Sequence, residues 1–176
     1  MDRDTYMAGK YDPETIATMG WRLAQIARRE GLPMADLETL TTRPSTFAAH
    51  RLMTAAIQEG AGRQQALGEA LFVAYWSRGE DIGAREVLLA AAEAAGMEAG
   101  AAARVLDGDA FAAEVRAQET EAARLGIHAV PTFVFDGRFS VVGAQDPEVL
   151  VRTARRALRD SRSPYPTRCD APAVTA

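Results

Sequence analysis

The sequence predicts a mostly α-helical chain, with about seven helices and one β-hairpin near its C-terminal end. Three observations lead to this fold class. Alanine is very frequent, and alanine loses no side-chain entropy in a helix. Apolar residues recur at helical spacing, with glycine and proline breaks between the runs. Only residues 132–142 change to β-branched and aromatic runs, which lie on either side of an Asp-Gly pair.

The first predicted helix begins at Asp12-Pro13-Glu14 and ends at Gly31. An aspartate suits the capping position, proline suits the first helical position, and a glutamate in the first turn complements the helix dipole. Glycine is the usual residue after a helix end. The apolar positions of this helix are Ile16, Met19, Leu23 and Ile26.

Five further helices are predicted between the breaks that follow, over about 45–60, 63–77, 87–95, 99–106 and 109–125. We expect Asp109 to cap the last of these and Gly126 to end it. The apolar positions of the first of these helices are Phe47, Leu52, Ala56 and Ile57, and Leu67, Leu71 and Tyr75 share one stripe of the second. The expected buried stripe of the last helix is Phe111, Val115, Ala122 and Leu125.

The hairpin is predicted from Thr132-Phe133-Val134-Phe135 and Arg138-Phe139-Ser140-Val141-Val142, joined by Asp136-Gly137. Asp-Gly favours a type I′ turn, which needs positive φ at both central residues. The first strand is apolar on both faces, as in strands covered by helices on each side. A last helix begins at Asp146-Pro147-Glu148, and the residues after about 160 have the composition of a disordered tail.

This set of elements is unbalanced. A two-stranded hairpin is marginal alone, because stable sheets need about three or more strands or strong packing. Both strands would also have an unpaired edge. We therefore expect either an all-α domain with a minor hairpin, or a sheet that something outside this chain completes. The doubly apolar first strand favours the second arrangement.

Composition excludes several classes of protein. The net charge is −4 and the pI is about 5.3, so general nucleic-acid binding is not expected. The single cysteine, Cys169, excludes an internal disulfide, a Cys-x-x-Cys pair and a multi-cysteine zinc site. With only His50 and His128, no metal site or other cofactor is predicted. The sequence shows neither a membrane span nor a signal peptide, which predicts a cytoplasmic protein that does not contact membranes.

Several stretches together resemble the DsbA-like oxidoreductases, with the FrnE-type proteins, near the 2-hydroxychromene-2-carboxylate isomerases, as the most similar branch. The main stretch runs from Gly126 through Val130-Pro131 to Phe139 and continues in Val142-Gly143-Ala144-Gln145. Two upstream stretches agree with it, in the same order as in the family. They are Ala49-His50-Arg51-Leu52, and Leu71 to Trp76 followed by Gly79-Glu80-Asp81-Ile82-Gly83.

The resemblance implies a bacterial α/β protein with a thioredoxin-like fold and an inserted helical domain. In that family a helix carries Cys-x-x-Cys at its N-terminus, and its first cysteine is the nucleophile. A cis-proline then precedes the hairpin, and the residue before it offers its backbone to a substrate. Here Val130 and Pro131 match that element, so they are the predicted substrate-binding residues and their peptide bond is predicted to be cis. The implied substrates are thiol- or disulfide-bearing proteins or peptides.

The departure from the family pattern concerns the nucleophile. The chain starts where the helical insertion would begin, so the thioredoxin sheet is expected to be incomplete, and Cys169 lies beyond the last helix. No catalytic residue is predicted. We expect a helical domain over 1–125, a thioredoxin-like part over 126–160 and a tail over 161–176. The leading interpretation is an N-terminally truncated and inactive thiol-disulfide oxidoreductase. The alternatives are a non-catalytic remnant that binds peptides or partners, and a glutathione-dependent isomerase-like relative; a homodimer that pairs two hairpins also stays open.

Other polar residues receive structural interpretations. His128 lies near the predicted substrate loop and could act as an acid or base, but a solvated loop histidine fits the pattern better. His50 is expected to be packed and hydrogen-bonded within its helix. The C-terminal arginines fit a solvated helix face near a helix end better than a phosphate site. These arginines are Arg152, Arg155, Arg156, Arg159, Arg162 and Arg168.

Overall fold

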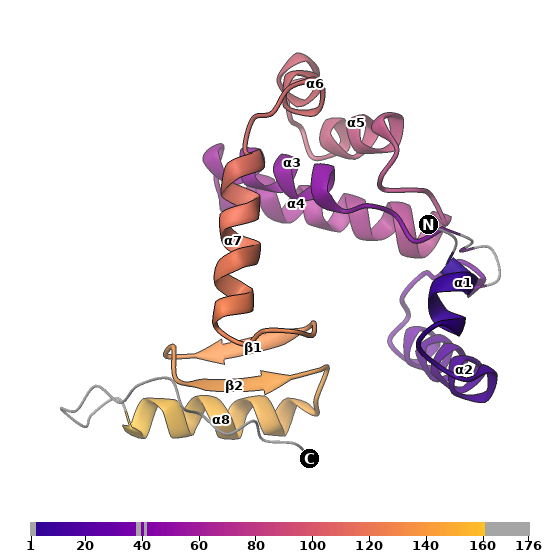
Figure 1. Cartoon of the computed structure of the whole chain (residues 1–176), viewed down its shortest axis with the longest axis vertical. Helices are drawn as coiled ribbons and strands as arrows, with labels where there is room; N and C mark the ends of the chain where they lie inside the picture. Colours follow the sequence, from indigo (N-terminus) through magenta and orange to yellow (C-terminus); the bar gives the residue numbers. More distant parts are fainter. Residues whose placement is uncertain (1–2, 38–39, 41, 161–176) are drawn as a thin grey trace. The chain divides into compact units, whose positions relative to one another are not determined.

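The computed structural model describes residues 3–37, 40 and 42–160 of the chain (Figure 1). It contains eight α-helices, one π-helical segment and a two-stranded sheet within these residues. The chain divides into two compact units, residues 1–116 and 117–176. The mostly helical prediction with a single hairpin is therefore confirmed. No helix within the described ranges is both long and apolar enough to cross a bilayer.

The regular elements of unit 1 are helices, and the last of them, α7, continues into unit 2. The first helix was not predicted, since its six residues carry too little periodicity to be recognised. The remaining helices fall where the apolar spacing placed them. The elements are α1 (Arg3–Ala8), α2 (Pro13–Arg29), α3 (Phe47–Gln58), α4 (Ala61–Phe72), the π-helix (Val73–Ser77), α5 (Arg85–Ala94), α6 (Ala99–Asp107) and α7 (Ala112–Arg124).

Side-chain caps fix two of these helix starts. Asp12 accepts a hydrogen bond of 2.9 Å from the backbone N–H of Thr15, which confirms its predicted capping role at α2. Glu98 caps α6 by accepting from the backbone N–H groups of Gly100 (2.8 Å) and Ala101 (2.6 Å). Each cap satisfies donors that have no partner inside the helix.

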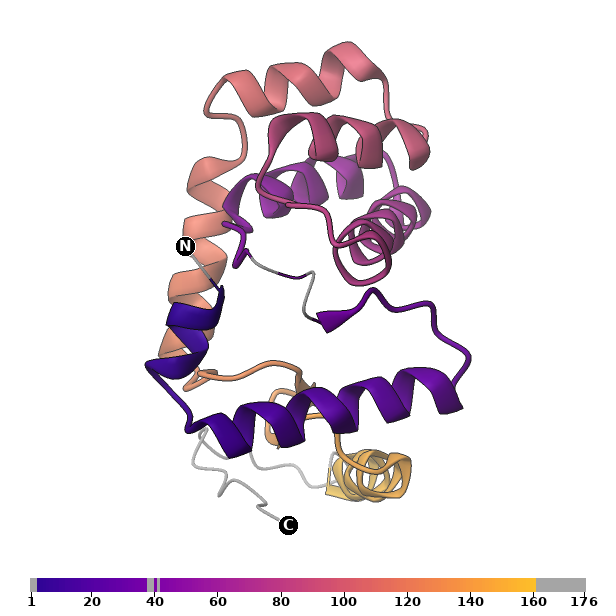
Figure 2. The same cartoon turned by 90° about the vertical axis from the view of Figure 1, so that its right-hand side faces the viewer.

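The core of unit 1 lies among α3, α4, α5 and α6, which Figure 2 shows gathered together. Three large leucines are almost fully buried there, namely Leu52, Leu67 and Leu88. Small side chains such as Ala56 and Ala92 fill the remaining contacts, and they let helix backbones approach closely. The alanine-rich composition therefore serves packing here as well as helix propensity.

The predicted helix over 63–77 does not stay α-helical to its end. It changes to a π-helix at Val73, after Phe72. Two tertiary hydrogen bonds reach this segment: the N–H of Ala35 donates to the backbone carbonyl of Trp76 (2.6 Å), and the side-chain hydroxyl of Ser77 donates to the carbonyl of Pro33 (2.8 Å). Apolar spacing along one helix cannot reveal such contacts, because their partners lie some forty residues away.

Unit 2 contains β1 (Thr132–Phe135), β2 (Phe139–Val142) and α8 (Pro147–Asp160). The strands are antiparallel, with Phe133 opposite Val141 and Phe135 opposite Phe139. Asp136 (φ 54°) and Gly137 (φ 62°) both have positive φ, which confirms the expected turn geometry. Helix α8 packs along the hairpin (Figure 1). Val141 and Ala157 are nearly fully buried.

The opposite face of the hairpin is exposed. Val134 and Val142 are 49% and 43% exposed, respectively. Strand residues alternate between faces, so these two valines share the side that α8 does not cover. Within the described residues β1 and β2 are the whole sheet, and each therefore has one edge without a strand partner. The expectation of an incomplete sheet is confirmed.

Two predictions about single side chains were wrong. Leu125 was placed in the buried stripe of its helix, but α7 ends at Arg124 and Leu125 is 50% exposed, so only Val115 of that stripe is fully buried. His50 was expected to be packed, but it lies on the exposed side of α3. The predicted tail, including Cys169, lies outside the described residues.

Candidate functional site: the loop before the hairpin

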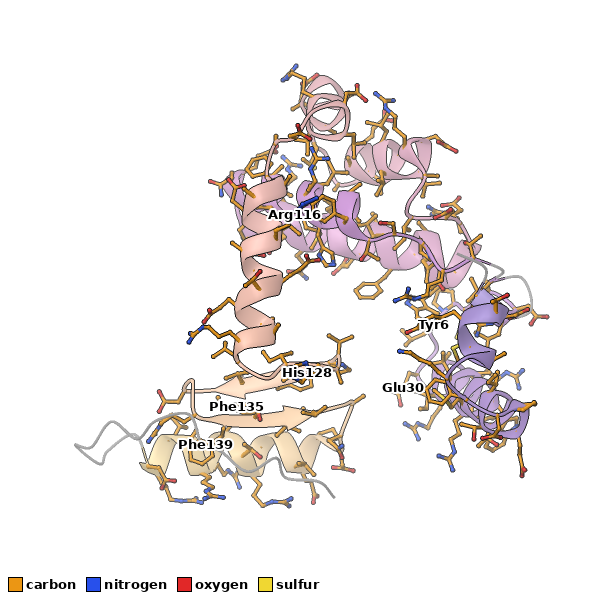
Figure 3. All side chains as sticks on the ribbon, viewed as in Figure 1. Tyr6, Glu30, Arg116, His128, Phe135 and Phe139 are labelled. Atoms are coloured by element: carbon orange, nitrogen blue, oxygen red, sulfur yellow. The ribbon has the colours of Figure 1, made fainter. Side chains whose placement is uncertain are left out.

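The candidate site is the loop that leads from α7 into β1, over residues 126–131. Gly126 begins it with φ 73°, a left-handed conformation that suits glycine after a helix end. The peptide bond between Val130 and Pro131 is cis. Figure 3 shows His128 on this loop, where its side chain is exposed. The two residues predicted to bind substrate are thus directly at the entry of the first strand.

Two hydrogen bonds hold the end of this loop. The Thr132 hydroxyl donates to the carbonyl of Ala129 over 2.6 Å, which closes the chain around Val130. The N–H of Gly143 donates to the carbonyl of Pro131 over 2.8 Å, which ties the loop to the residue after β2. Sequence reasoning missed both anchors as functional, although Gly143 belongs to the Val142–Gln145 stretch of the family resemblance.

Gly143 occupies a position that favours glycine. Its φ is 85°, and a Cβ atom at this residue would lie 3.5 Å from Nε2 of Gln145. The Gln145 side-chain amide in turn donates to the carbonyl of Val142 over 3.0 Å. These contacts fix the segment between β2 and α8. They thereby fix Gly143, whose N–H donates to the carbonyl of Pro131.

Val130 is the most exposed large apolar residue among those described, at 89%. Its backbone N–H and C=O make no hydrogen bond with any described residue. An exposed backbone donor and acceptor beside a strand edge can pair with an added extended peptide. The arrangement therefore offers main-chain recognition, which depends little on the sequence of the bound peptide.

The described residues of this site supply binding groups but no nucleophile. None of them is a cysteine, since Cys169 is the only one in the sequence and lies outside the described ranges. Metal chemistry has no candidate centre in the described part of the chain, where no group of three or more His, Asp or Glu side chains is placed to hold an ion. The loop by itself is thus a recognition element.

A second concave surface lies in unit 1 and was not predicted from the sequence. It is a groove of about 1170 Å³ between α1, α2 and residues 32–37. Trp21 and Leu32 line it and are 65% and 60% exposed. Such a groove has no signal in the sequence, because the segment 32–37 carries no regular periodicity.

Unit 2 has a hairpin that follows a cis-proline and a helix that packs on one face of this hairpin. This arrangement is typical of a thioredoxin-like fold, and the comparisons with known proteins agree. The sequence matches the family model described as DSBA-like thioredoxin domain over residues 2–154. The chain belongs to this DsbA-like family. A search of curated proteins returns no match.

One solved structure extends this assignment. The chain resembles the crystal structure of a probable DsbA oxidoreductase from Streptomyces coelicolor, with 30% sequence identity and a TM-score of 0.80. The similarity covers 100% of this chain and 77% of that protein. The family is one of thiol-disulfide oxidoreductases, so thiol- or disulfide-bearing molecules are its class of substrate.

Proposed function

We propose that this chain forms the substrate-recognition part of a cytoplasmic thiol-disulfide oxidoreductase of the FrnE-type branch. The observation that carries the proposal is the free backbone of Val130, next to Pro131 and 89% exposed. An extended segment of a protein or peptide substrate would pair with this backbone, as strands add to an exposed sheet edge. The substrate's side chains would contribute little to binding, because the Val130 side chain projects into solvent and the pairing is made by the backbone.

The chemistry requires a thiolate that these residues do not provide. In thiol-disulfide exchange a thiolate attacks one sulfur of a disulfide, a mixed disulfide forms and the other sulfur leaves as a thiolate. A second thiolate of the enzyme then attacks the mixed disulfide, so the enzyme dithiol is oxidised to a disulfide while the substrate disulfide is reduced. One cysteine in 176 residues cannot complete this cycle within the chain. We therefore propose that a Cys-x-x-Cys segment, outside these residues, pairs with the free edge of β1.

The exposed face of the hairpin supports this arrangement. A strand added beside β1, with its helix, would cover the side on which Val134 and Val142 are exposed. It would also give the sheet three strands, the number at which sheets become independently stable. A symmetric pair of chains that joins two hairpins would satisfy the same edge, so sedimentation of the 176-residue chain is the first measurement. A monomer favours the added segment.

Insulin reduction tests the catalytic part of the proposal. The 176-residue chain should reduce insulin no faster than a thiol-free control protein, and Cys169→Ser should leave that rate unchanged. Intact mass of the protein from its native source should then show additional residues that include Cys-x-x-Cys, and that longer form should be active. Turnover by the 176-residue chain that Cys169→Ser abolishes would contradict the proposal.

A native protein that starts at Met1, folds cooperatively as a monomer and lacks exchange activity would instead favour a non-catalytic binding protein. The exposed backbone of Val130 fits that second function equally well, because main-chain pairing needs no thiol.

A further inference from the structure

The outer face of α8, opposite the side that packs on the hairpin, combines positive charge with exposed apolar residues. We name this surface the α8 strip. Its members are Val151, Arg152, Arg155, Leu158 and Arg159, and all five are exposed. On a helix of 3.6 residues per turn these five positions fall on one side, within an arc of about 120°.

The three arginines of the strip have no partner among the described residues. Arg152, Arg155 and Arg159 make no ion pair, hydrogen bond or aromatic contact there. The other arginine of α8 differs, since the guanidinium of Arg156 lies over the ring of Phe139 and 3.7 Å from a carboxylate oxygen of Asp160. The strip therefore presents concentrated positive charge that the hairpin and α8 do not neutralise.

The strip also exposes apolar surface. Leu158 is 70% exposed, second only to Val130 among the large apolar residues that the structure describes, and Val151 is 47% exposed. Leu158 does not stabilise the fold by burial, because the apolar side of α8 that faces the hairpin is the side of Ala157. A free anion would leave this surface in water, whereas a protein segment could cover it.

An acidic side chain limits the strip at its N-terminal end. Glu148 lies at the first turn of α8, on the same side as the arginines. The positive stretch from Arg152 to Arg159 is about 10 Å long at the helical rise. An extended polyanion such as a nucleic acid, or a flat anionic membrane, would meet this carboxylate as well. A short segment with two or three carboxylates would not.

We propose that the α8 strip docks a short acidic segment of a partner protein, one that carries an apolar side chain among its carboxylates. Charge complementarity selects this occupant, since guanidinium groups bind carboxylates through paired hydrogen bonds. Residues 161–176 of the chain itself do not complement the strip, because they contain Arg162 and Arg168 against a single Asp170. The docking surface is separate from the Val130 loop, and it does not depend on the proposed thiol chemistry.

Fluorescence anisotropy with a defined probe tests this inference. The probe is a fluorescein-labelled 12-residue peptide of glutamate, alanine and leucine, with two leucines between the glutamates on one helical face. We expect the 176-residue chain to bind it, and binding to weaken as salt is raised. The triple variant Arg152→Gln, Arg155→Gln, Arg159→Gln should weaken binding about tenfold, the sum of three exposed pairs. Leu158→Gln should also weaken it, by a smaller factor.

The matched control is a triple variant on α2, Arg22→Gln, Arg28→Gln, Arg29→Gln, which changes the net charge equally and should leave affinity unchanged. Circular dichroism of each variant verifies that the helices are intact. The inference fails if the peptide does not bind, if its glutamine counterpart binds equally well, or if the α2 variant loses as much affinity. Tighter binding to vesicles rich in phosphatidylserine, or to a single-stranded oligonucleotide, would also overturn it.

Discussion

Arg51 Nε on α3 donates a hydrogen bond of 2.8 Å to the carbonyl oxygen of Ala110, 59 residues further along the chain. The same guanidinium also donates to the carbonyls of Val105 and Gly108, at and just after the C-terminal end of α6. Arg51 is only 7% exposed, and its bonding partners are carbonyl groups rather than a carboxylate. The unpaired carbonyls at a helix end carry partial negative charge, so they can stabilise this buried cation.

Replacing Arg51 by methionine should destabilise unit 1 by about 3 kcal/mol or more. The variant keeps an apolar stem but leaves buried or partly buried carbonyls without their donor, and each hydrogen bond to a charged group contributes about 1.5 to 3 kcal/mol. Urea unfolding followed by the helical circular dichroism signal measures the loss. Arg51→Lys should be intermediate, because an ammonium group cannot reproduce the planar fork that spans three carbonyls.

Arg22→Met is the control, since Arg22 lies on the exposed side of α2 and should change stability by less than about 0.5 kcal/mol. If the Arg51 and Arg22 variants unfold at the same urea concentration, then the carbonyl cluster does not hold α3 against the end of α6.

The sequence predicted most of the helices because their signals are local. Asp12 and the apolar spacing after it place α2 correctly, and Asp136-Gly137 places the hairpin turn, since both depend on the immediate neighbours in the chain. Phe111 shows where local reasoning fails. It was expected in a helical stripe, but its φ is 62° and it precedes α7. The carbonyl of Ala110, the residue before it, accepts a hydrogen bond from the distant Arg51, a contact that spacing along the chain does not reveal.

Only part of the candidate site could be predicted from the sequence. Val130 and Pro131 were recognised from a stretch of contiguous residues, which a family resemblance can reveal. The bond from Gly143 to Pro131, the exposed face around Val134 and the α8 strip depend on which elements pack together. Tertiary packing decides these features, so spacing along the chain carries no signal for them.

The cap of α6 should make stability depend on pH. Hydrogen bonds from the backbone N–H groups of Gly100 and Ala101 hold the pKa of the Glu98 carboxyl below its ordinary value. A carboxylate with a lowered folded-state pKa contributes stability that is complete above its unfolded pKa and is lost as pH falls through the folded value. Glu98→Gln should therefore lower Tm at pH 7, and the difference from the parent chain should shrink below about pH 4.

Thermal melts at pH 7, 5 and 3.5 check this prediction. Glu119→Gln on the exposed side of α7 is the control for the removal of one negative charge. A Tm difference for the Glu98 variant that stays constant across this range would mean that the carboxylate charge plays no part in the cap.

The hairpin turn should be sensitive to a Cβ atom at its second central residue. Gly137 has φ 62°, a conformation that costs an L residue about 1 to 2 kcal/mol, so Gly137→Ala should raise amide exchange across residues 132–142. Gly62→Ala should change stability in the opposite direction. Gly62 lies within α4 with open space around a built Cβ, and alanine there should stabilise the helix by up to about 1 kcal/mol. A Gly137 variant with unchanged exchange would show that the turn tolerates another geometry.

Two adjacent residues of β2 offer a direct test of which hairpin face is covered. Val141 is 1% exposed on the side of α8, whereas Val142 is 43% exposed on the other side. The same substitution, valine to threonine, changes little in volume but introduces a hydroxyl group that needs a hydrogen-bond partner. At position 141 the buried hydroxyl should cost about 1 to 3 kcal/mol, while at position 142 water satisfies it and the cost should stay below about 0.5 kcal/mol.

Hydrogen exchange of the segment 132–142, measured by mass spectrometry, reports this difference directly. Val141→Thr should speed exchange about tenfold, since about 1.4 kcal/mol corresponds to one factor of ten, and Val142→Thr should leave it close to that of the parent chain. In the longer protein proposed above, an added strand and helix would cover Val142 as well, so its substitution should there become costly too. Equal sensitivity at both positions in the 176-residue chain would mean that both faces of the hairpin are already buried.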